Sequence, residues 1–347
     1  MSQAVTGGAT EQGSGAPHAL LRPGDDLGEW DRFVDGSPQG CIFCRSWWLE
    51  AVAPGQFEIL VLRRGGKIAA GMPLVHHRRW GLRAIGMPPL TQTLGPLLGP
   101  PTSDNYEKRL SGEMELLTEL VAAVPRVALL NVLCHHSLTN WLPFYWAGYQ
   151  QTTRYTYVIE DLSDPEAVFA RFAPTKRQKV RKAEKLVEVR EDLPPADFYS
   201  HHAMTMRKRG DTINYSQELF ERIHRATAER DAGKTWFAVG AQGRIHSAIF
   251  VIFGARSAYY LISAVDPEYR SSDANTLLIK RAIDHVASRT KRFDFEGSMI
   301  RGVEGSFRKF GAVQTPYFHL SKSGLLVRAG LALREARHRR GERQGGE

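Results

Sequence analysis

The sequence lacks long apolar stretches and the features of a secretion signal. None of its 347 residues belong to an apolar run of about 18 residues, the length that a membrane-spanning helix needs. The N-terminal segment has neither the basic start nor the apolar centre of a signal peptide. Its Gly, Ser, Ala and Thr content instead predicts a disordered leader over residues 1–18. We therefore expect a cytoplasmic protein without an integral membrane segment.

Cysteine is scarce. Three cysteines cannot form the disulfide framework of a small secreted domain, which agrees with a reducing compartment. Cys41 and Cys44 form a C-x-x-C pair, and Cys134 with the two histidines that follow it could complete a zinc site if the segments met in space. Because a second C-x-x-C pair is missing, we expect buried apolar cysteines and no metal.

Motifs of several enzyme classes are also missing. The chain has no P-loop, no H-E-x-x-H motif and no Ser-His-Asp order of a hydrolase triad. Histidines occur in three adjacent pairs, and neighbouring residues on a strand point to opposite faces, so at most one of each pair reaches a given site. His135 follows a predicted buried strand. We expect it to line a substrate cleft, with an ordinary loop histidine as the alternative.

Positive charge is what the chain has in excess. The net charge is +9 and the isoelectric point is near 9.5. This favours an anionic partner such as tRNA, a nucleotide-linked precursor, CoA or an acidic membrane surface, without choosing among them. The Arg-rich segment 321–347 is expected to be a basic tail, or a helix that packs back on the first domain. Peripheral membrane contact through this tail is the alternative.

Helix and strand patterns run through the chain twice. The first pass has a predicted hairpin over 57–75, a Gly- and Pro-rich irregular segment over 81–101, a helix over 106–123 and strands over 127–133 and 155–159. The second pass has basic and mixed helices, followed by three strands, a helix from about residue 275 and a short strand at 293–296. The two passes meet near residue 161.

Five short motifs are spread over residues 40–320. They are Phe43-x-Arg45-Ser46-x-Trp48, the basic run Lys176 to Ala183, Met206 to Gly210, Asp273 to Asn275, and Phe293 to Gly297. Together they resemble the FemABX-like branch of the GNAT-fold acyltransferases. The resemblance implies an α/β fold of two tandem GNAT-like domains, each with a mixed, mostly antiparallel sheet flanked by helices. We expect these domains over residues 19–160 and 161–320.

The same resemblance implies an activity. FemABX-like enzymes form an amide by moving an aminoacyl or acyl group to an amine. Here it implies transfer from aminoacyl-tRNA to a small-molecule or peptide acceptor that bears phosphate, such as a peptidoglycan precursor. An arginine and a following tyrosine contact the acceptor phosphates in such enzymes, which makes Arg207 and Tyr215 the candidates. Trp48 and Asn275, both within the motifs, are expected to bind substrate as well.

Two acidic residues could orient or deprotonate the acceptor amine. Asp294 and Glu296 alternate with phenylalanines on a predicted strand, so both carboxylates point the same way. Amide formation needs a neutral amine and a path for its proton, and these acids could orient or deprotonate it. Ion pairs with Arg292 or Arg301 are the structural alternative.

Other groups could polarise the carbonyl of the transferred acyl group or donate a hydrogen bond to it. Tyr260, or its neighbour Tyr259, could offer a hydroxyl, although aromatic residues of a core strand usually pack. Many relatives have a lysine in this role, but alignment on the final Phe-Gly puts Phe307 at its position. Arg308 or Lys309 would then have to polarise the carbonyl.

The basic helix and the loop at 269–275 bear on the donor. Lys179 and Lys182 lie about one turn apart, so a row that faces phosphate is available, with a solvated charged face as the alternative. The loop lacks the glycines with which CoA-dependent members hold pyrophosphate at a helix N-terminus, and Asp273 would repel phosphate. We therefore expect aminoacyl-tRNA as donor and no bound cofactor.

Two other functions stay open. The first is an acyl-CoA-dependent GNAT N-acyltransferase in polysaccharide or small-molecule biosynthesis. The second is a noncatalytic nucleic-acid-binding protein that uses the basic helix and tail.

Overall fold

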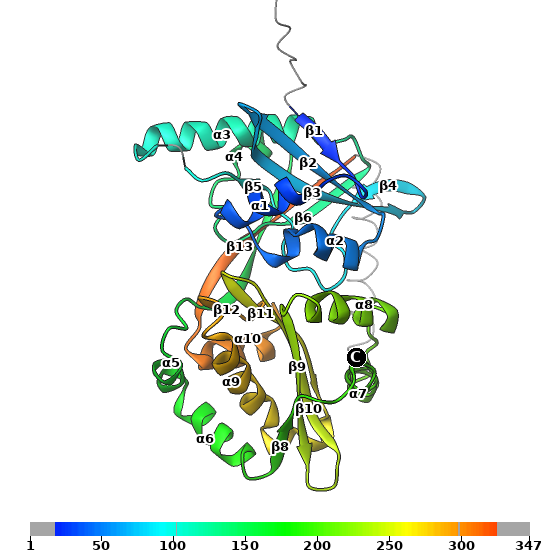
Figure 1. Cartoon of the computed structure of the whole chain (residues 1–347), viewed down its shortest axis with the longest axis vertical. Coiled ribbons are helices and arrows are strands. Elements are labelled where there is room, and N and C mark those ends of the chain that lie inside the picture. The colour runs from blue at the N-terminus through cyan, green and yellow to red at the C-terminus, as the bar shows by residue number, and fades with distance from the viewer. Residues whose placement is uncertain (1–17, 102, 298, 325–347) are drawn as a thin grey trace, which may run out of the picture.

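A computed structural model describes residues 18–101, 103–297 and 299–324 of the chain (Figure 1). The first part of the chain, from β1 to β6, forms what we call the first half. Its elements are β1 (His18–Leu21), α1 (Gly28–Gly36), η1 (Ile42–Cys44), α2 (Ser46–Val52), β2 (Phe57–Arg64), β3 (Lys67–Arg79), β4 (Leu82–Ile85), β5 (Leu97–Leu98), α3 (Tyr106–Ala123) and β6 (Leu129–Leu133).

The second half runs from α5 to η3. Its elements are α5 (Pro165–Arg171), α6 (Pro174–Ala183), β8 (Val187–Arg190), α7 (Pro195–Lys208), α8 (Gln217–Ala228), β9 (Gly233–Gly240), β10 (Ile245–Phe253), β11 (Ser257–Val265), η2 (Pro267–Ser272), α9 (Ala274–Val286), β12 (Arg292–Asp294), α10 (Arg301–Phe307) and η3 (Arg308–Phe310). The remaining elements join the two halves, namely α4 (Leu142–Trp146), β7 (Gln150–Ile159) and β13 (Val313–Ser323).

Each half contains one parallel strand pair connected through a helix. In the first half β4 and β6 are parallel and α3 connects them, whereas in the second half β11 and β12 are parallel and α9 connects them. The other pairs in both halves are antiparallel. This repeated topology agrees with the predicted tandem arrangement, although the sequence shows no close repeat.

A two-stranded ribbon connects the halves. β7 and β13 pair antiparallel, from Val313 opposite Val158 to Ser321 opposite Gln150. β7 also pairs with β12 of the second half, and β13 pairs with β6 of the first. The strand order is therefore continuous, β1-β2-β3-β4-β6-β13-β7-β12-β11-β10-β9-β8. In Figure 1 β13 rises from the lower half into the upper one.

Two apolar cores lie on opposite faces of the second-half sheet. Alternation along β11 sends Tyr259 and Leu261 into a core shared with the first half, and Tyr260 into a core under α9. The shared core includes Phe43 of η1 and Phe198 of α7. The boundary between the halves is thus partly hydrophobic core, which fixes the position of the residues along it.

Several details differ from the sequence-based expectation. The segment 81–101 is not wholly irregular, because β4 and β5 lie within it, and β7 begins at residue 150, earlier than predicted. His18, placed in the leader, starts β1 and pairs with Leu62. Residues 1–17 and 325–347, to which most of the predicted leader and tail belong, lie outside the described residues. Within the described part of the chain, no helix has the length and apolar character needed to cross a membrane.

Candidate active site

The parallel strands β11 and β12 separate beyond three paired residues. Ser257 to Tyr259 pair with Arg292 to Asp294, where β12 ends, while β11 continues to Val265. At the same point β11 bulges, since Phe250 of β10 pairs with Ile262 and the next residue pairs with Tyr260. Bulges redirect side chains and are frequent beside active sites. Most of the predicted catalytic residues lie around this separation.

Asp294 is buried where the two halves meet. Three hydrogen bonds converge on its Oδ1, from Gln92 Nε2 of the first half at 3.4 Å, from Thr156 Oγ1 of β7, and from the Glu296 backbone N–H at 2.7 Å. Burial raises the pKa of the carboxyl to about 6, although the hydrogen bonds oppose this shift. Asp294 is therefore a carboxylate at pH 7 that can take up a proton.

Glu296 lies beside it in a strained conformation. Its φ of 58° is in the left-handed region, which residues other than glycine rarely adopt. Its Oε1 is shielded from solvent and has no hydrogen-bond partner among the described residues. Burial and the neighbouring Asp294 charge hold its pKa well above the ordinary value, so the pair retains a proton that a single exposed acid would lose.

The structural alternative for these acids is not observed. Arg292 forms an ion pair with Glu160 at 2.8 Å instead. Within the described ranges, no ion pair joins Asp294 or Glu296 to a cation. Phe293 and Phe295 point into the core under α9, while Asp294 lies on the opposite face, as the alternation predicted.

Tyr260 and Asn275 form a second polar group near the separation. The Tyr260 hydroxyl lies 3.0 Å from Asn275 Oδ1 and 2.9 Å from Asn275 Nδ2, at the first turn of α9. Ser247 and Ser263 donate to the same Oδ1. Burial raises the pKa of Tyr260 to about 12, so its hydroxyl keeps its proton and can donate it in a hydrogen bond. The sequence predicts both residues as parts of the site but does not predict this contact.

Lys179 and Lys182 are brought together, and an acid lies between them. Lys179 Nζ is 2.5 Å from Asp273 Oδ1, and Lys182 Nζ is 3.2 Å from Asp273 Oδ2. Lys182 also donates to the Ser271 carbonyl at 2.5 Å. Asp273 precedes α9 with a φ of 60°. The predicted phosphate-facing row thus ends on a carboxylate at the start of this helix.

A third lysine of the same helix was not singled out by the sequence. Lys176 is only 9% exposed, donates to Ser306 Oγ at 2.9 Å, and lies 4.1 Å above the Phe310 ring. Burial and nearby Lys179 and Lys309 lower its pKa to about 8. The sequence does not distinguish Lys176 from the other five cations of this basic run, because composition does not show which of them is buried.

The remaining predicted residues form no hydrogen bond or ion pair with the acid pair in the described part of the chain. Arg308 is exposed and lies 3.6 Å from Glu304. Arg207 is exposed at the end of α7. Tyr215 is buried, and its hydroxyl lies 2.7 Å from His202 Nδ1.

Trp48 and His135 have mainly structural contacts. Trp48 is fully buried, packs edge-on to Phe43, and donates its ring N–H to Thr91 at 3.1 Å. His135 is buried against His136, and burial and that neighbour hold its pKa well below the ordinary value. The described residues contain no cluster of three potential metal ligands, so they give the zinc alternative no support.

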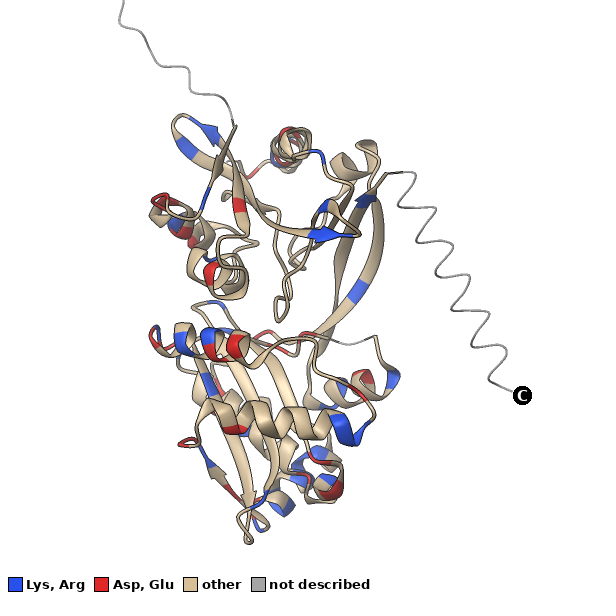
Figure 2. Cartoon of the chain, turned by 90° about the vertical axis from the view of Figure 1, so that its right-hand side faces the viewer, with Lys and Arg blue, Asp and Glu red and all other residues tan. Residues whose placement is uncertain are grey.

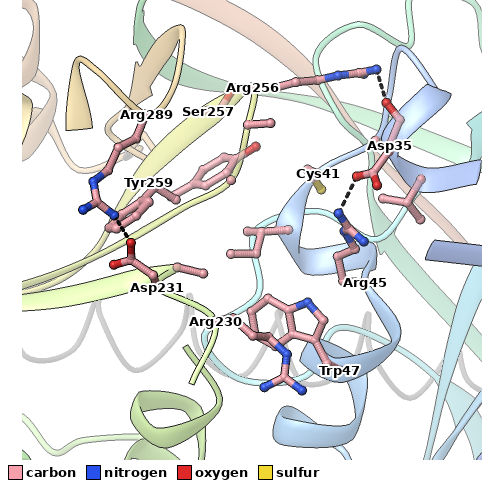
Figure 3. A pocket seen from close by; sticks show the side chains of 17 residues that line it. Asp35, Cys41, Arg45, Trp47, Arg230, Asp231, Arg256, Ser257, Tyr259 and Arg289 are labelled. Carbon is pink, nitrogen blue, oxygen red and sulfur yellow. Dashed lines mark hydrogen bonds and ion pairs between the residues drawn. The ribbon is translucent and has the colours of Figure 1, made fainter. Parts of the chain in front are cut away.

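A pocket of about 690 Å³ lies between the halves (Figure 3). Trp47 and Cys41 line it from the first half, and Ser257 and Tyr259 line it from β11. Four arginines also line it, of which Arg45 pairs with Asp35 at 2.5 Å and Arg289 pairs with Asp231. The neighbouring acids therefore offset part of the positive charge of this pocket.

Comparison with known proteins agrees with this geometry. Residues 170–305 match the family model described as an acetyltransferase (GNAT) domain. This part of the chain therefore resembles a GNAT domain. The match confirms the predicted GNAT-type acyltransferase, and it places both acids, Tyr260 and Lys176 inside the matched region. No curated protein matches the chain.

Solved structures share the fold across both halves. FemX has a TM-score of 0.64 at 12% identity, with 86% of this chain and 96% of that chain covered. A tandem GNAT protein from the clavulanic acid biosynthesis pathway has a TM-score of 0.51 at 12% identity, with 88% and 98% covered. A conserved protein of unknown function from Bacteroides thetaiotaomicron has a TM-score of 0.55 at 11% identity, with 84% and 94% covered. These similarities establish the tandem GNAT fold.

Proposed function

We propose that this N-acyltransferase moves an aminoacyl group from aminoacyl-tRNA to the amine of a phosphate-bearing acceptor, such as a peptidoglycan precursor. The observation that carries the choice of donor is the Asp273 carboxylate at the start of α9. Helix N-termini bind pyrophosphate through free N–H groups, and a carboxylate held there by Lys179 and Lys182 opposes a CoA pyrophosphate.

The proposed reaction uses the acid pair as its proton acceptor. The acceptor amine attacks the ester carbonyl, a C–N bond forms, and the C–O bond to the tRNA ribose breaks. Asp294 takes the proton that the amine loses, and this proton finally reaches the departing ribose oxygen. The Tyr260 hydroxyl, held by Asn275 on the α9 side of the sheet, is the proposed hydrogen-bond donor for the carbonyl oxygen.

Arg207 remains the proposed contact for acceptor phosphate, whereas Tyr215 is buried against His202 and would have to leave that partner to reach a phosphate. Arg207 is exposed and is available to a ligand, and a guanidinium binds phosphate through two parallel hydrogen bonds. Lys and Arg are spread over both halves of the described chain rather than gathered in one stretch (Figure 2). This distribution favours local phosphate contacts over one extended basic face.

The acyl-CoA-dependent enzyme is the second candidate. It is favoured by the match to an acetyltransferase domain and by the position of α9 beside the separation of β11 and β12. The GNAT match weighs against a noncatalytic nucleic-acid-binding protein. The absence of a cofactor, the cytoplasmic location and membrane contact through the tail remain predictions.

Mass spectrometry of acceptors distinguishes the two donors. A set of amine acceptors, including nucleotide-linked muropeptides, is incubated with charged tRNA or with acyl-CoA. We expect an aminoacyl mass increment with charged tRNA that disappears with Asp294→Asn. An acyl increment with acyl-CoA alone would contradict the proposed donor and support the second candidate.

A further inference from the structure

Cys41 and Cys44 form a close pair of thiols in the first half. Their sulfur atoms are 3.7 Å apart, and both thiols are free. Cys41 directly precedes η1 and Cys44 ends it, and side chains three residues apart eclipse in a 3-10 turn. A disulfide bond measures about 2.05 Å, so a small movement of the two side chains would close it. We propose that this pair is a redox-modification site, which a peroxide oxidises to an intramolecular disulfide.

The surroundings give the two thiols different roles. Cys41 Sγ lies 3.4 Å from Thr93 Oγ1, and hydrogen bonds from Cys44 and Thr93 lower the pKa of the Cys41 thiol. The same contact with Cys41, together with burial, raises the pKa of Cys44. The thiolate is the form that attacks an oxidant, so Cys41 is the attacking sulfur and Cys44 resolves the intermediate.

Access also favours Cys41. It lines the pocket of about 690 Å³ between the halves, where Figure 3 shows it across from Tyr259. Its exposed fraction is 8%, whereas Cys44 and Cys134 are both fully buried. A small oxidant that enters the pocket therefore meets Cys41 first.

The chemistry balances without a metal or a further cofactor. The Cys41 thiolate attacks hydrogen peroxide, the O–O bond breaks, and Cys41 sulfenic acid and hydroxide form. The Cys44 thiol then attacks the sulfenic sulfur, an S–S bond forms, and water leaves. In total two thiols lose two electrons and two protons, and the peroxide becomes two molecules of water. A dithiol reductant reverses the modification.

The modification would act on the boundary between the halves. η1 connects α1 and α2, and Arg256 of the second half donates to the Asp35 and Ser37 carbonyls just before η1. Phe43 inside the pair packs on Tyr259 with ring centroids 4.7 Å apart. A disulfide would therefore fix the turn that forms one wall of the pocket. This inference does not depend on the proposed acyl transfer.

Thiol counting with peptide mapping tests the proposal on the full-length protein. We expect hydrogen peroxide to reduce the free thiols from three to one, with the new bond between residues 41 and 44 and full recovery after dithiothreitol. Cys134→Ser is the matched control and should form the same bond. With Cys44→Ser, Cys41 should stop at sulfenic acid, which dimedone traps.

Reaction rates give an independent reading. In the native protein we expect a maleimide to label Cys41 at least about tenfold faster than Cys134, because thiolate character and access both favour it. Circular dichroism checks that each serine variant is folded. Three thiols that survive peroxide in the folded wild type, or a bond that includes Cys134, would overturn the proposal.

Discussion

Two acidic sites in the second half differ in what surrounds the carboxylate. Asp273 lies between the ammonium groups of Lys179 and Lys182, which are about half exposed. Asp294 and Glu296 are shielded at the boundary between the halves, and the recorded partners of Asp294 are neutral. Burial without a neighbouring cation raises the pKa of Asp294 and Glu296, so these two acids hold protons more tightly than an exposed acid. The ion pairs of Asp273 thus suit a structural role, and the burial of Asp294 and Glu296 suits proton transfer.

The largest difference between the two sites is expected when Asp294 is changed. We expect Asp294→Asn to reduce turnover by about a hundredfold or more, because the amide cannot accept the amine proton. The three hydrogen bonds described above all go to Asp294 Oδ1, and the amide oxygen of asparagine can accept them in its place, so the fold should persist. Steady-state kinetics per folded molecule measure the effect, and an unchanged rate would show that the acid is structural.

The same variant has a predicted effect on stability. The pKa of Asp294 is raised from 3.8 to about 6, so between these values the folded state holds a proton that the unfolded state has lost. The free energy of unfolding therefore falls as the pH rises through this window, by up to about 3 kcal/mol at pH 7. Asp294→Asn should remove this loss and raise the melting temperature at pH 7. It should also abolish the rise in wild-type kcat/KM through about pH 6.

Glu296 should respond less strongly to the matching change. Its pKa is held well above the ordinary value, so Gln resembles the protonated side chain that burial favours. We expect Glu296→Gln to reduce turnover about tenfold, and Glu296→Ala to reduce it further because the hydrogen-bonding group is lost. Equal losses with Gln and Ala would mean that the ionised carboxylate is required.

Asp273 provides the reverse test, since removing the carboxylate should create a phosphate site. The wild type should not bind CoA at micromolar concentration. Asp273→Gly suits the positive φ, removes the negative charge and leaves Lys179 and Lys182 unpaired, so CoA affinity should rise about tenfold or more. Calorimetry measures both, with Asp273→Asn as the size-matched control. Tight stoichiometric binding to the wild type would contradict the proposed donor.

The smallest effect is expected at the lysines themselves. Lys179 and Lys182 are 46% and 52% exposed, so each ion pair with Asp273 is screened by water. We expect Lys179→Ala to lower the free energy of unfolding by no more than about 1 kcal/mol. Urea unfolding at low and high salt measures this, and a larger, salt-independent loss would show that the pair does more than hold the loop.

The sequence predicts the local parts of this picture well. The order of elements and the alternation that separates Asp294 from Phe293 and Phe295 follow from periodicity, and the tandem fold follows from the element order together with the resemblance to FemABX-like enzymes. Contacts between segments that are distant in sequence could not be predicted in this way. Gln92 reaches Asp294 across 202 positions, and Lys179 reaches Asp273 across 94. Pairing of this kind depends on tertiary packing, and so do the burial of Lys176 and the bulge of β11.

The crossing strand β13 has a consequence for how the chain folds during synthesis. β6 of the first half finds its antiparallel neighbour only in residues 319–323, so its edge stays open until almost the whole described chain has left the ribosome. Contacts so distant in sequence form slowly, and open strand edges favour aggregation. A nascent first half should therefore depend on chaperones until translation of β13 is complete.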